Sequence, residues 1–147
     1  MKIVSAIMLC LFISGCSCTR PSMLGVKEGK LAPCPGSPNC VSTQAQDDTH
    51  RIDPIKYTGT KEQAKQRLMQ VISSMRRVRV ITDTGDYIHV EFTSRLFRFV
   101  DDVEFSFDDT NKLINFRSAS RKGYSDLGVN RKRMEKIRER FESSSSK

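Results

Sequence analysis

The sequence predicts an α+β protein, a two-layer sandwich in which a four-stranded antiparallel meander packs against two helices. Three observations support this fold. An amphipathic helical stripe comes first, four segments with strand periodicity follow it, and a second helical stripe ends the pattern. Short polar turns separate the strand segments, and strands joined by short turns pair antiparallel. The predicted order is therefore helix, four strands, helix.

The chain has the size and composition of one globular domain. Of its 147 residues, 37% are hydrophobic and 29% are charged, which excludes a collagen, a coiled-coil rod, a solenoid and a large cofactor enzyme. Lys and Arg total 25 against 17 Asp and Glu, so the net charge is +8. Because there are only two His, a zinc site of the Cys/His kind is hard to assemble. We expect neither a metal nor a cofactor.

Residues 1–15 are typical of a bacterial lipoprotein signal peptide. Their apolar run of 3–13 is too short to cross a membrane as a helix. The run ends in Ile13-Ser14-Gly15-Cys16, which resembles the lipobox before a lipidated cysteine. We therefore expect Cys16 to carry the acyl chains of a membrane anchor. Ser17 resembles the outer-membrane sorting pattern, so the domain would face the periplasm. An ordinary cleaved signal peptide and a chance apolar start are the alternatives.

Cysteine usage fits an exported chain. Cys34 and Cys40 flank a turn-forming Pro-Gly-Ser-Pro-Asn segment, and an oxidising periplasm favours a disulfide between them. A loop this small contributes only about 2 kcal/mol, so the bond would shape a loop rather than hold the domain together. A redox pair or two metal ligands are alternatives, although five intervening residues do not match the CxxC pattern of such sites.

The mature chain divides into a tether, one domain and a tail. Residues 16–30 are polar and unpatterned, and we expect them to link the lipid to a domain over 31–142. Residues 31–57 hold four of the five prolines and are expected to be ordered coil. The last five residues, 143–147, are expected to be a disordered tail.

The first helix is predicted over Lys61–Met75. Thr60 followed by Gln63 resembles a capping box at its start. Its apolar stripe is Ala64, Leu68, Val71, Ile72 and Met75.

Strand periodicity follows over 78–83, 87–93 and 97–107, and again around Ile114 and Phe116. In the third strand the predicted inward residues are Phe97, Phe99, Val103, Phe105 and Phe107, with Asp101 at the same parity. A second helix is predicted over Arg131–Phe141, with Met134, Ile137 and Phe141 on its apolar side.

Asp101, Asp102 and Glu104 form the first group of candidate functional residues. Alternation puts Asp101 on the face of the phenylalanines, where an unpaired carboxylate is costly. Either it is a structural carboxylate bonded to an arginine or a backbone N–H, or a bulge re-aims it, or it is functional. The acids could also serve a small envelope hydrolase as general acid and base, or bind a divalent cation.

The segment 117–131, between the last strand and the last helix, forms the second group. Arginine forks, hydroxyls and a helix N-terminus are the groups that hold an anionic ligand. The candidate ligand-binding residues are Arg117, Ser118, Ser120, Arg121, Tyr124 and Arg131, with the three acids orienting the arginines. The alternatives are that Asp126 or Asn130 caps the helix and that an arginine makes an internal salt bridge with those acids.

Positive charge concentrates near the C-terminus. From 117 to 140 there are nine Lys or Arg and three Asp or Glu. The signal sequence argues against nucleic acid as the partner, so anionic lipid headgroups or envelope polyanions are preferred, and a solvated helix face is the alternative. The sequence contains no GxSxG, HExxH or P-loop motif.

Three ordered blocks, 31–42, 94–105 and 117–131, are similar to the signatures of the family called domain of unknown function 1499. The resemblance covers residues 29–142 and implies one intact domain, but it implies no activity. We therefore expect a non-catalytic binding or accessory module, lipid-anchored in the cell envelope, whose partner is an anionic small molecule or an envelope protein. The small envelope hydrolase is the alternative.

Overall fold

A computed structural model describes residues 19–144, which fold into two helices and a six-stranded antiparallel sheet. Residues 1–18, which include the predicted signal peptide and Cys16, and residues 145–147 lie outside this range. The helices are α1 (Lys61–Ser73) and α2 (Val129–Ser143). The strands are β1 (Cys40–Ser42), β2 (Ile55–Lys56), β3 (Val78–Thr84), β4 (Tyr87–Thr93), β5 (Val100–Asp108) and β6 (Leu113–Ser120). The α+β class is confirmed. Among residues 19–144, no helix combines the length and the apolar character needed to span a bilayer.

The first helix forms where its cap and apolar stripe predict it. The Thr60 hydroxyl accepts a hydrogen bond from the Gln63 N–H, and the Gln63 side chain accepts one from the Thr60 N–H, which completes the capping box. The stripe residues Ala64, Leu68, Val71 and Ile72 are buried. The helix ends two residues earlier than predicted, at Ser73, and Met75 still packs against the core.

The sheet has six strands in place of the predicted four. Its order is β1-β6-β5-β4-β3, with β2 also paired to β6. Both additional strands come from residues 31–57, which were expected to be coil. β1 and β2 have three and two residues, too few to show a period of two, and they form because β6 offers an open edge. The predicted disulfide between Cys34 and Cys40 is present beside β1.

The third predicted strand begins later than its phenylalanines suggested. β5 starts at Val100, and Phe97 and Phe99 are exposed rather than buried, so their predicted inward placement is wrong. Thr93 pairs with Val100, which leaves residues 94–99 as the loop between β4 and β5. Arg98 has a φ of +53°, which interrupts an extended strand at that point.

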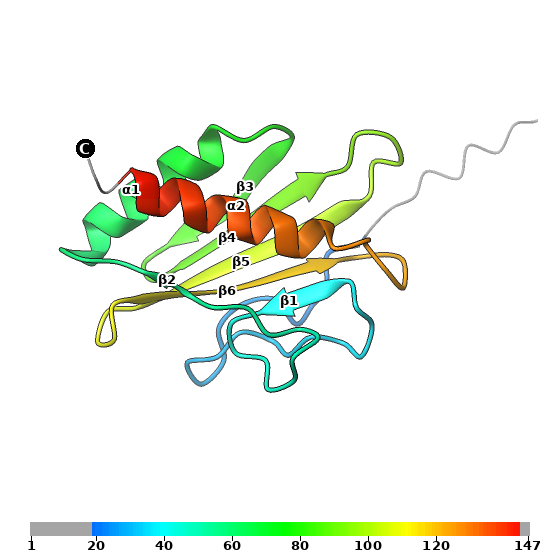
Figure 1. The fold of residues 1–147 in the computed structure, drawn as a ribbon, viewed down its shortest axis with the longest axis horizontal. Coiled ribbons are helices and arrows are strands. Elements are labelled where there is room, and N and C mark those ends of the chain that lie inside the picture. The colour runs from blue at the N-terminus through cyan, green and yellow to red at the C-terminus, as the bar shows by residue number, and fades with distance from the viewer. Residues whose placement is uncertain (1–18, 145–147) are drawn as a thin grey trace, which may run out of the picture.

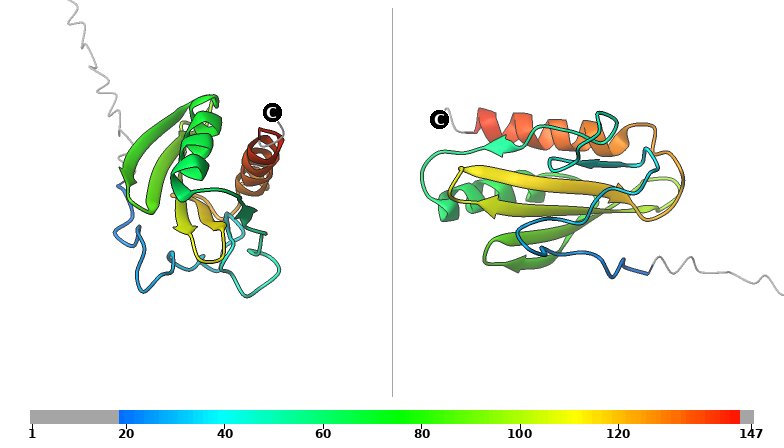
Figure 2. Two further views of the ribbon diagram at one scale, coloured as in Figure 1. Left: turned by 90° about the vertical axis from the view of Figure 1, so that its left-hand side faces the viewer. Right: turned by 90° about the horizontal axis from the view of Figure 1, so that it is seen from below.

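Both helices lie on one face of the sheet, and the chain from Arg20 to Leu31 runs along the other (Figures 1 and 2). On the helix side, alternate strand residues form the core with the helices, among them Ile88, Val90, Phe105 and Phe116. The residues between them point to the opposite face. There Arg20 contacts Glu91 and the Gly25 N–H donates to Glu104, so the segment predicted as a tether lies against the sheet from Arg20 onward.

Candidate functional site

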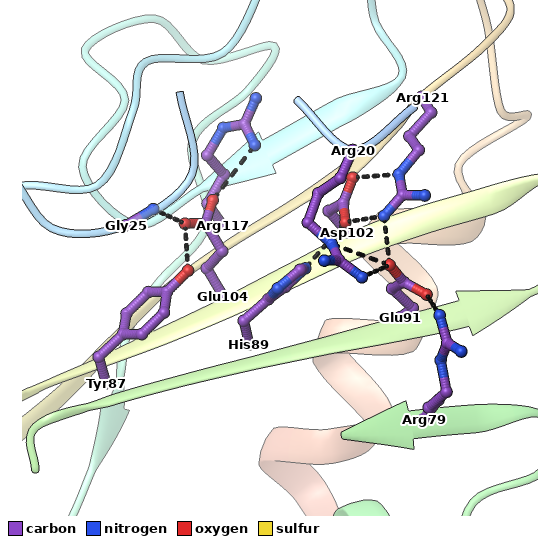
Figure 3. Close-up of polar contacts among 10 residues, drawn as sticks. All are labelled: Arg20, Gly25, Arg79, Tyr87, His89, Glu91, Asp102, Glu104, Arg117 and Arg121. Atoms are coloured by element: carbon purple, nitrogen blue, oxygen red, sulfur yellow. Dashed lines mark hydrogen bonds and ion pairs between the residues drawn. The ribbon is translucent and has the colours of Figure 1, made fainter. Parts of the chain in front are cut away.

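The face of the sheet opposite the helices carries a group of buried ionisable side chains, here called the charge cluster (Figure 3). Charged groups are rarely buried unless they are paired. The charge cluster consists of Tyr87, His89, Glu91, Asp102, Glu104, Arg117 and Arg121, together with Arg20 and Arg79 at its margin. Its central members come from β4, β5 and β6 at positions that alternate with the core residues, so strand pleating places them together.

Glu104 is the centre of one half of the cluster and is fully buried. The Tyr87 hydroxyl donates to it at 2.8 Å and the Gly25 N–H at 2.7 Å. Arg117 donates from 3.4 Å, and its Nε is the one buried side-chain nitrogen or oxygen within residues 19–144 that lacks a hydrogen-bond partner. Burial and the neighbouring Glu104 raise the pKa of Tyr87. The hydroxyl therefore stays protonated and remains a donor.

Asp102 and Glu91 form the other half, and Arg121 joins them. Arg121 donates to Asp102 at 2.7 and 2.8 Å and to Glu91 at 2.5 Å. His89 Nε2 lies 2.8 Å from Asp102 Oδ1, an oxygen that Arg121 also contacts. Arg20 and Arg79 contact Glu91 from the margin of the cluster. Burial alone would raise the pKa of both carboxyls, but the hydrogen bonds that they accept outweigh it. The pKa of Glu91 falls to about 2, and that of Asp102 lies below its ordinary range.

The contacts of the charge cluster pair its arginines with its carboxylates. Arg121 and Arg117 are each paired with carboxylates, as in the internal salt bridge that the sequence left open. A carboxyl with a lowered pKa is ionised at neutral pH, so Asp102 has no proton to give as a general acid. The cluster is also covered by the segment that begins at Arg20.

Asp101, Ser118 and Ser120 lie on the helix side of the sheet and join a different network. Asp101 accepts hydrogen bonds from Ser120 and from Arg133 of α2, each at 2.6 Å. The Ser118 hydroxyl donates at 2.5 Å to Asn130, the buried residue near the start of α2. This network fastens α2 to the end of β6. Asp101 is thus a buried carboxylate paired with an arginine, but with Arg133 rather than Arg117 or Arg121.

The remaining two residues of the predicted ligand site lie apart from these networks. The Tyr124 side chain is exposed. Arg131 donates to the backbone carbonyls of Thr49 and Arg51. The Asp126 carboxylate accepts from the N–H groups of Gly128 and Asn130 and so supports the start of α2, although the N-cap residue is Gly128 and not Asp126 or Asn130. The six predicted ligand-binding residues therefore do not converge on one opening.

A cavity of about 630 Å³ lies between the end of α1, the end of β4 and the first half of α2. Seven of its lining residues are Lys or Arg and none is Asp or Glu. We call this the basic cavity. Its lining is Ser74, Met75, Arg76, Arg77, Phe92, Thr93, Ser94, Arg95, Val129, Lys132, Arg133, Lys136 and Arg140.

Three of these cations are fixed by the protein. Arg133 is paired with Asp101 and stacks 4.7 Å from the Phe92 ring centroid. Arg77 donates to the Thr93 carbonyl, and Arg140 donates to the Ser74 hydroxyl. The other four are Arg76, Arg95, Lys132 and Lys136, which form no ion pair with any residue between 19 and 144. Their charges are available to a ligand.

Sequence reasoning located the basic end of the chain but missed this cavity. One signal was present, since Lys132, Lys136 and Arg140 are spaced by four residues and therefore share a helix face. The contributions of Arg76, Arg77 and Arg95 come from distant loops, and only the fold brings them to α2.

No group of three His, Cys, Asp or Glu within residues 19–144 is placed to hold a metal ion. No curated protein and no solved structure matches the chain. A family model described as protein of unknown function (DUF1499) matches residues 30–141, which is most of the chain. That match includes the basic cavity and both networks apart from the contacts of Arg20 and Gly25, and the chain therefore belongs to the DUF1499 family.

Proposed function

We propose that this protein is a non-catalytic binding or accessory module of the bacterial cell envelope, and that it holds an anionic group in the basic cavity. The observation that carries the proposal is the charge of the lining, with seven cations and no carboxylate around about 630 Å³. Arginine and lysine clusters attract phosphate and carboxylate groups, and the arginine fork binds them bidentately.

The basic cavity is a better anion site than the predicted one in segment 117–131. The guanidinium groups of Arg117 and Arg121 already face Glu104, Asp102 and Glu91. An anion there would have to displace buried carboxylates, which is unfavourable. Lys132 and Lys136 require no such exchange.

The envelope location is supported by the N-terminal pattern and by the disulfide. The run that ends at Cys16 resembles a lipobox, and acyl chains on that cysteine give stable attachment to a membrane. The Cys34–Cys40 bond is of the kind that persists in an oxidising compartment such as the periplasm. Incorporation of labelled palmitate, lost in Cys16→Ser, tests the anchor.

The lining also supports a non-catalytic role. It contains no His, Cys, Asp or Glu, so no imidazole, thiolate or carboxylate is available there as a general base. A hydrolase that uses Asp101, Asp102 and Glu104 is the competing function, and the buried pair of His89 and Asp102 is the observation that favours it. If it were correct, Asp102→Asn would abolish hydrolysis of chromogenic ester, phosphate or glycoside substrates while the fold survived.

Phosphate titration tests the anion site. The test uses a chain of residues 19–147 exported to the periplasm, which contains every helix and strand that the structure describes. We expect inorganic phosphate to shift the amide NMR signals of Arg77, Thr93 and Val129, and we expect Lys132→Gln/Lys136→Gln to abolish those shifts.

The matched control is Lys27→Gln/Lys30→Gln, which removes the same charge from exposed positions on the N-terminal segment. Equal loss of the shifts in both double variants would mean that phosphate responds to net charge alone, and it would refute the site.

A further inference from the structure

Two loops lie side by side at one end of the sheet. The loop 94–99 joins β4 to β5, and the loop 121–128 joins β6 to α2. Their flanking strands are adjacent, because Thr93 pairs with Val100 and the Arg121 N–H donates to the Val100 carbonyl. Both loops therefore project from the same end of the sheet (Figure 1).

These loops and the start of α2 display apolar side chains to solvent. The four most exposed large hydrophobic residues described all belong to them: Leu127 at 87%, Leu96 at 79%, Tyr124 at 74% and Phe97 at 70%. Phe99 stacks on Phe97 with ring centroids 5.5 Å apart, so the loop 94–99 presents a preformed aromatic pair. Exposed apolar side chains gathered in two loops that leave adjacent strands are typical of a contact surface.

The backbone holds these side chains outward at a cost. Leu127 has a φ of +55° and Arg98 a φ of +53°, a region that disfavours branched and bulky residues. Hydrogen bonds maintain both conformations. The Leu127 N–H donates to the Ser125 hydroxyl, and Ser94 and Phe99 bond to each other across the loop. Contacts within the protein therefore fix the conformation of each loop.

The apolar loops adjoin the basic cavity. Ser94 and Arg95 of the first loop and Val129 after the second are part of its lining, together with the unpaired Lys132 and Lys136. Apolar side chains rimmed by cations complement one surface well, an anionic bilayer, whose interface accepts aromatic and aliphatic groups below its phosphates.

The N-terminal end of the described chain lies at the same end of the molecule (Figures 1 and 2). Arg20 is bonded to Glu91 near the end of β4. Cys16 precedes Thr19 by three residues, a stretch of chain that spans at most about 10 Å. A lipid on Cys16 would therefore keep both loops close to the bilayer.

We propose that this end of the molecule docks on an anionic phospholipid bilayer, with Leu96, Phe97, Tyr124 and Leu127 in the interface and the cations of the basic cavity on lipid phosphates. This inference rests on the proposed anion site and names its ligand as the phosphate of a membrane lipid.

Single tryptophans test the docking, because the chain contains none. Phe97→Trp and Leu127→Trp place a reporter at the tip of each loop, and Thr110→Trp places one in the exposed turn between β5 and β6, at the opposite end of the sheet.

The protein used in this test is residues 19–147, without lipid. The probes are vesicles of phosphatidylethanolamine with phosphatidylglycerol, and neutral phosphatidylcholine vesicles. We expect blue-shifted emission and quenching by brominated lipid for the two loop reporters with anionic vesicles only, and no change for Thr110→Trp.

Two double variants separate the apolar and charge contributions. Phe97→Ser/Leu127→Ser should lower partitioning into anionic vesicles by at least about tenfold, since two interfacial side chains are lost. Lys132→Gln/Lys136→Gln should lower it by about fivefold for each charge removed. All four positions are exposed, and unchanged circular dichroism confirms that each variant is folded.

The outcomes distinguish this inference from the proposed function. Loop reporters that do not respond, or three reporters that respond alike, overturn the docking. If phosphate still titrates the basic cavity in that case, the anion site stands and its ligand is a soluble anion or an acidic protein surface. If neither phosphate nor vesicles depend on Lys132 and Lys136, both proposals fail.

Discussion

Arg121 is the single residue on which the charge cluster depends most. It bonds Asp102 and Glu91 together, and its side chain is only 7% exposed. Arg121→Ala would leave two buried carboxylates with fewer partners, and breaking a buried pair from one side costs about 3–5 kcal/mol. We therefore expect Arg121→Ala to lower the free energy of unfolding by an amount in that range, measured by urea denaturation at pH 7.

Arg79→Ala is the matched control, because Arg79 bonds the same Glu91 from a side chain that is 71% exposed. Solvent screening limits an exposed pair to less than about 1 kcal/mol. Equal losses in the two variants would show that burial of Arg121 is not the source of its effect. A large loss in Arg121→Ala would also mean that this variant cannot report ligand binding by the intact fold.

The pKa of Glu91 makes stability depend on pH. Hydrogen bonds from Arg20, Arg121 and Arg79 outweigh burial and lower it from 4.5 to about 2. A carboxyl whose pKa is lower in the folded state stabilises the fold above its unfolded pKa and loses that contribution as pH falls toward the folded pKa. We expect the decrease in unfolding free energy between pH 5 and pH 2 to be about 3 kcal/mol smaller in Glu91→Gln than in the parent protein. Parallel pH profiles for the two proteins would contradict this.

At the scale of elements, the start of α1 offers a test that involves no charge. The Thr60 hydroxyl accepts from the Gln63 N–H, which would otherwise lack an intrahelical partner. Thr60→Ala should lower the free energy of unfolding by about 1 kcal/mol, measured by thermal or urea denaturation. Thr60→Ser retains the oxygen and should stay within a few tenths of the parent value. A similar loss in both variants would assign the effect to packing of the threonine methyl group.

Long periodic elements were predictable from the sequence, and short ones were not. Both helices formed around their predicted apolar stripes, since these stripes bury against the sheet. β1 and β2 form only because β6 pairs with them, a long-range cause that local periodicity does not carry. Phe97 and Phe99 continued the alternation of β5, yet the left-handed backbone at Arg98 turns them out to solvent.

The candidate site shows the same limit. The parity of Asp101 correctly placed a carboxylate among apolar side chains, but its partner Arg133 comes from α2, which the sequence could not align with it. The basic cavity needs residues from α2 and from two loops that precede it by more than thirty positions. The sequence predicts which residue types are present and which of them share one face of a helix or strand. Which charged residues pair across the chain becomes known only from the folded structure.

At the scale of the whole molecule, the N-terminal segment that was predicted as a tether contacts the folded domain. Arg20 and the Gly25 N–H contact Glu91 and Glu104 of the charge cluster. A hydrogen bond to a charged group contributes about 1.5–3 kcal/mol when buried. Because the acceptor Glu104 is fully buried while Arg20 is 46% exposed, a chain of residues 27–147 should lose about 2–4 kcal/mol of unfolding free energy relative to 19–147.

A chain in which positions 19–26 hold Gly and Ser at the same length separates contact from tether length. It keeps the spacing but loses the Arg20 side chain and the packing that fixes Gly25, so its urea midpoint should fall with that of the truncated chain. A midpoint equal to that of 19–147 would identify the segment as a plain tether. If both altered chains are destabilised, residues 19–26 are part of the folded domain, and the proposed lipid on Cys16 would hold the loops at that end near the bilayer through a folded segment rather than a flexible linker.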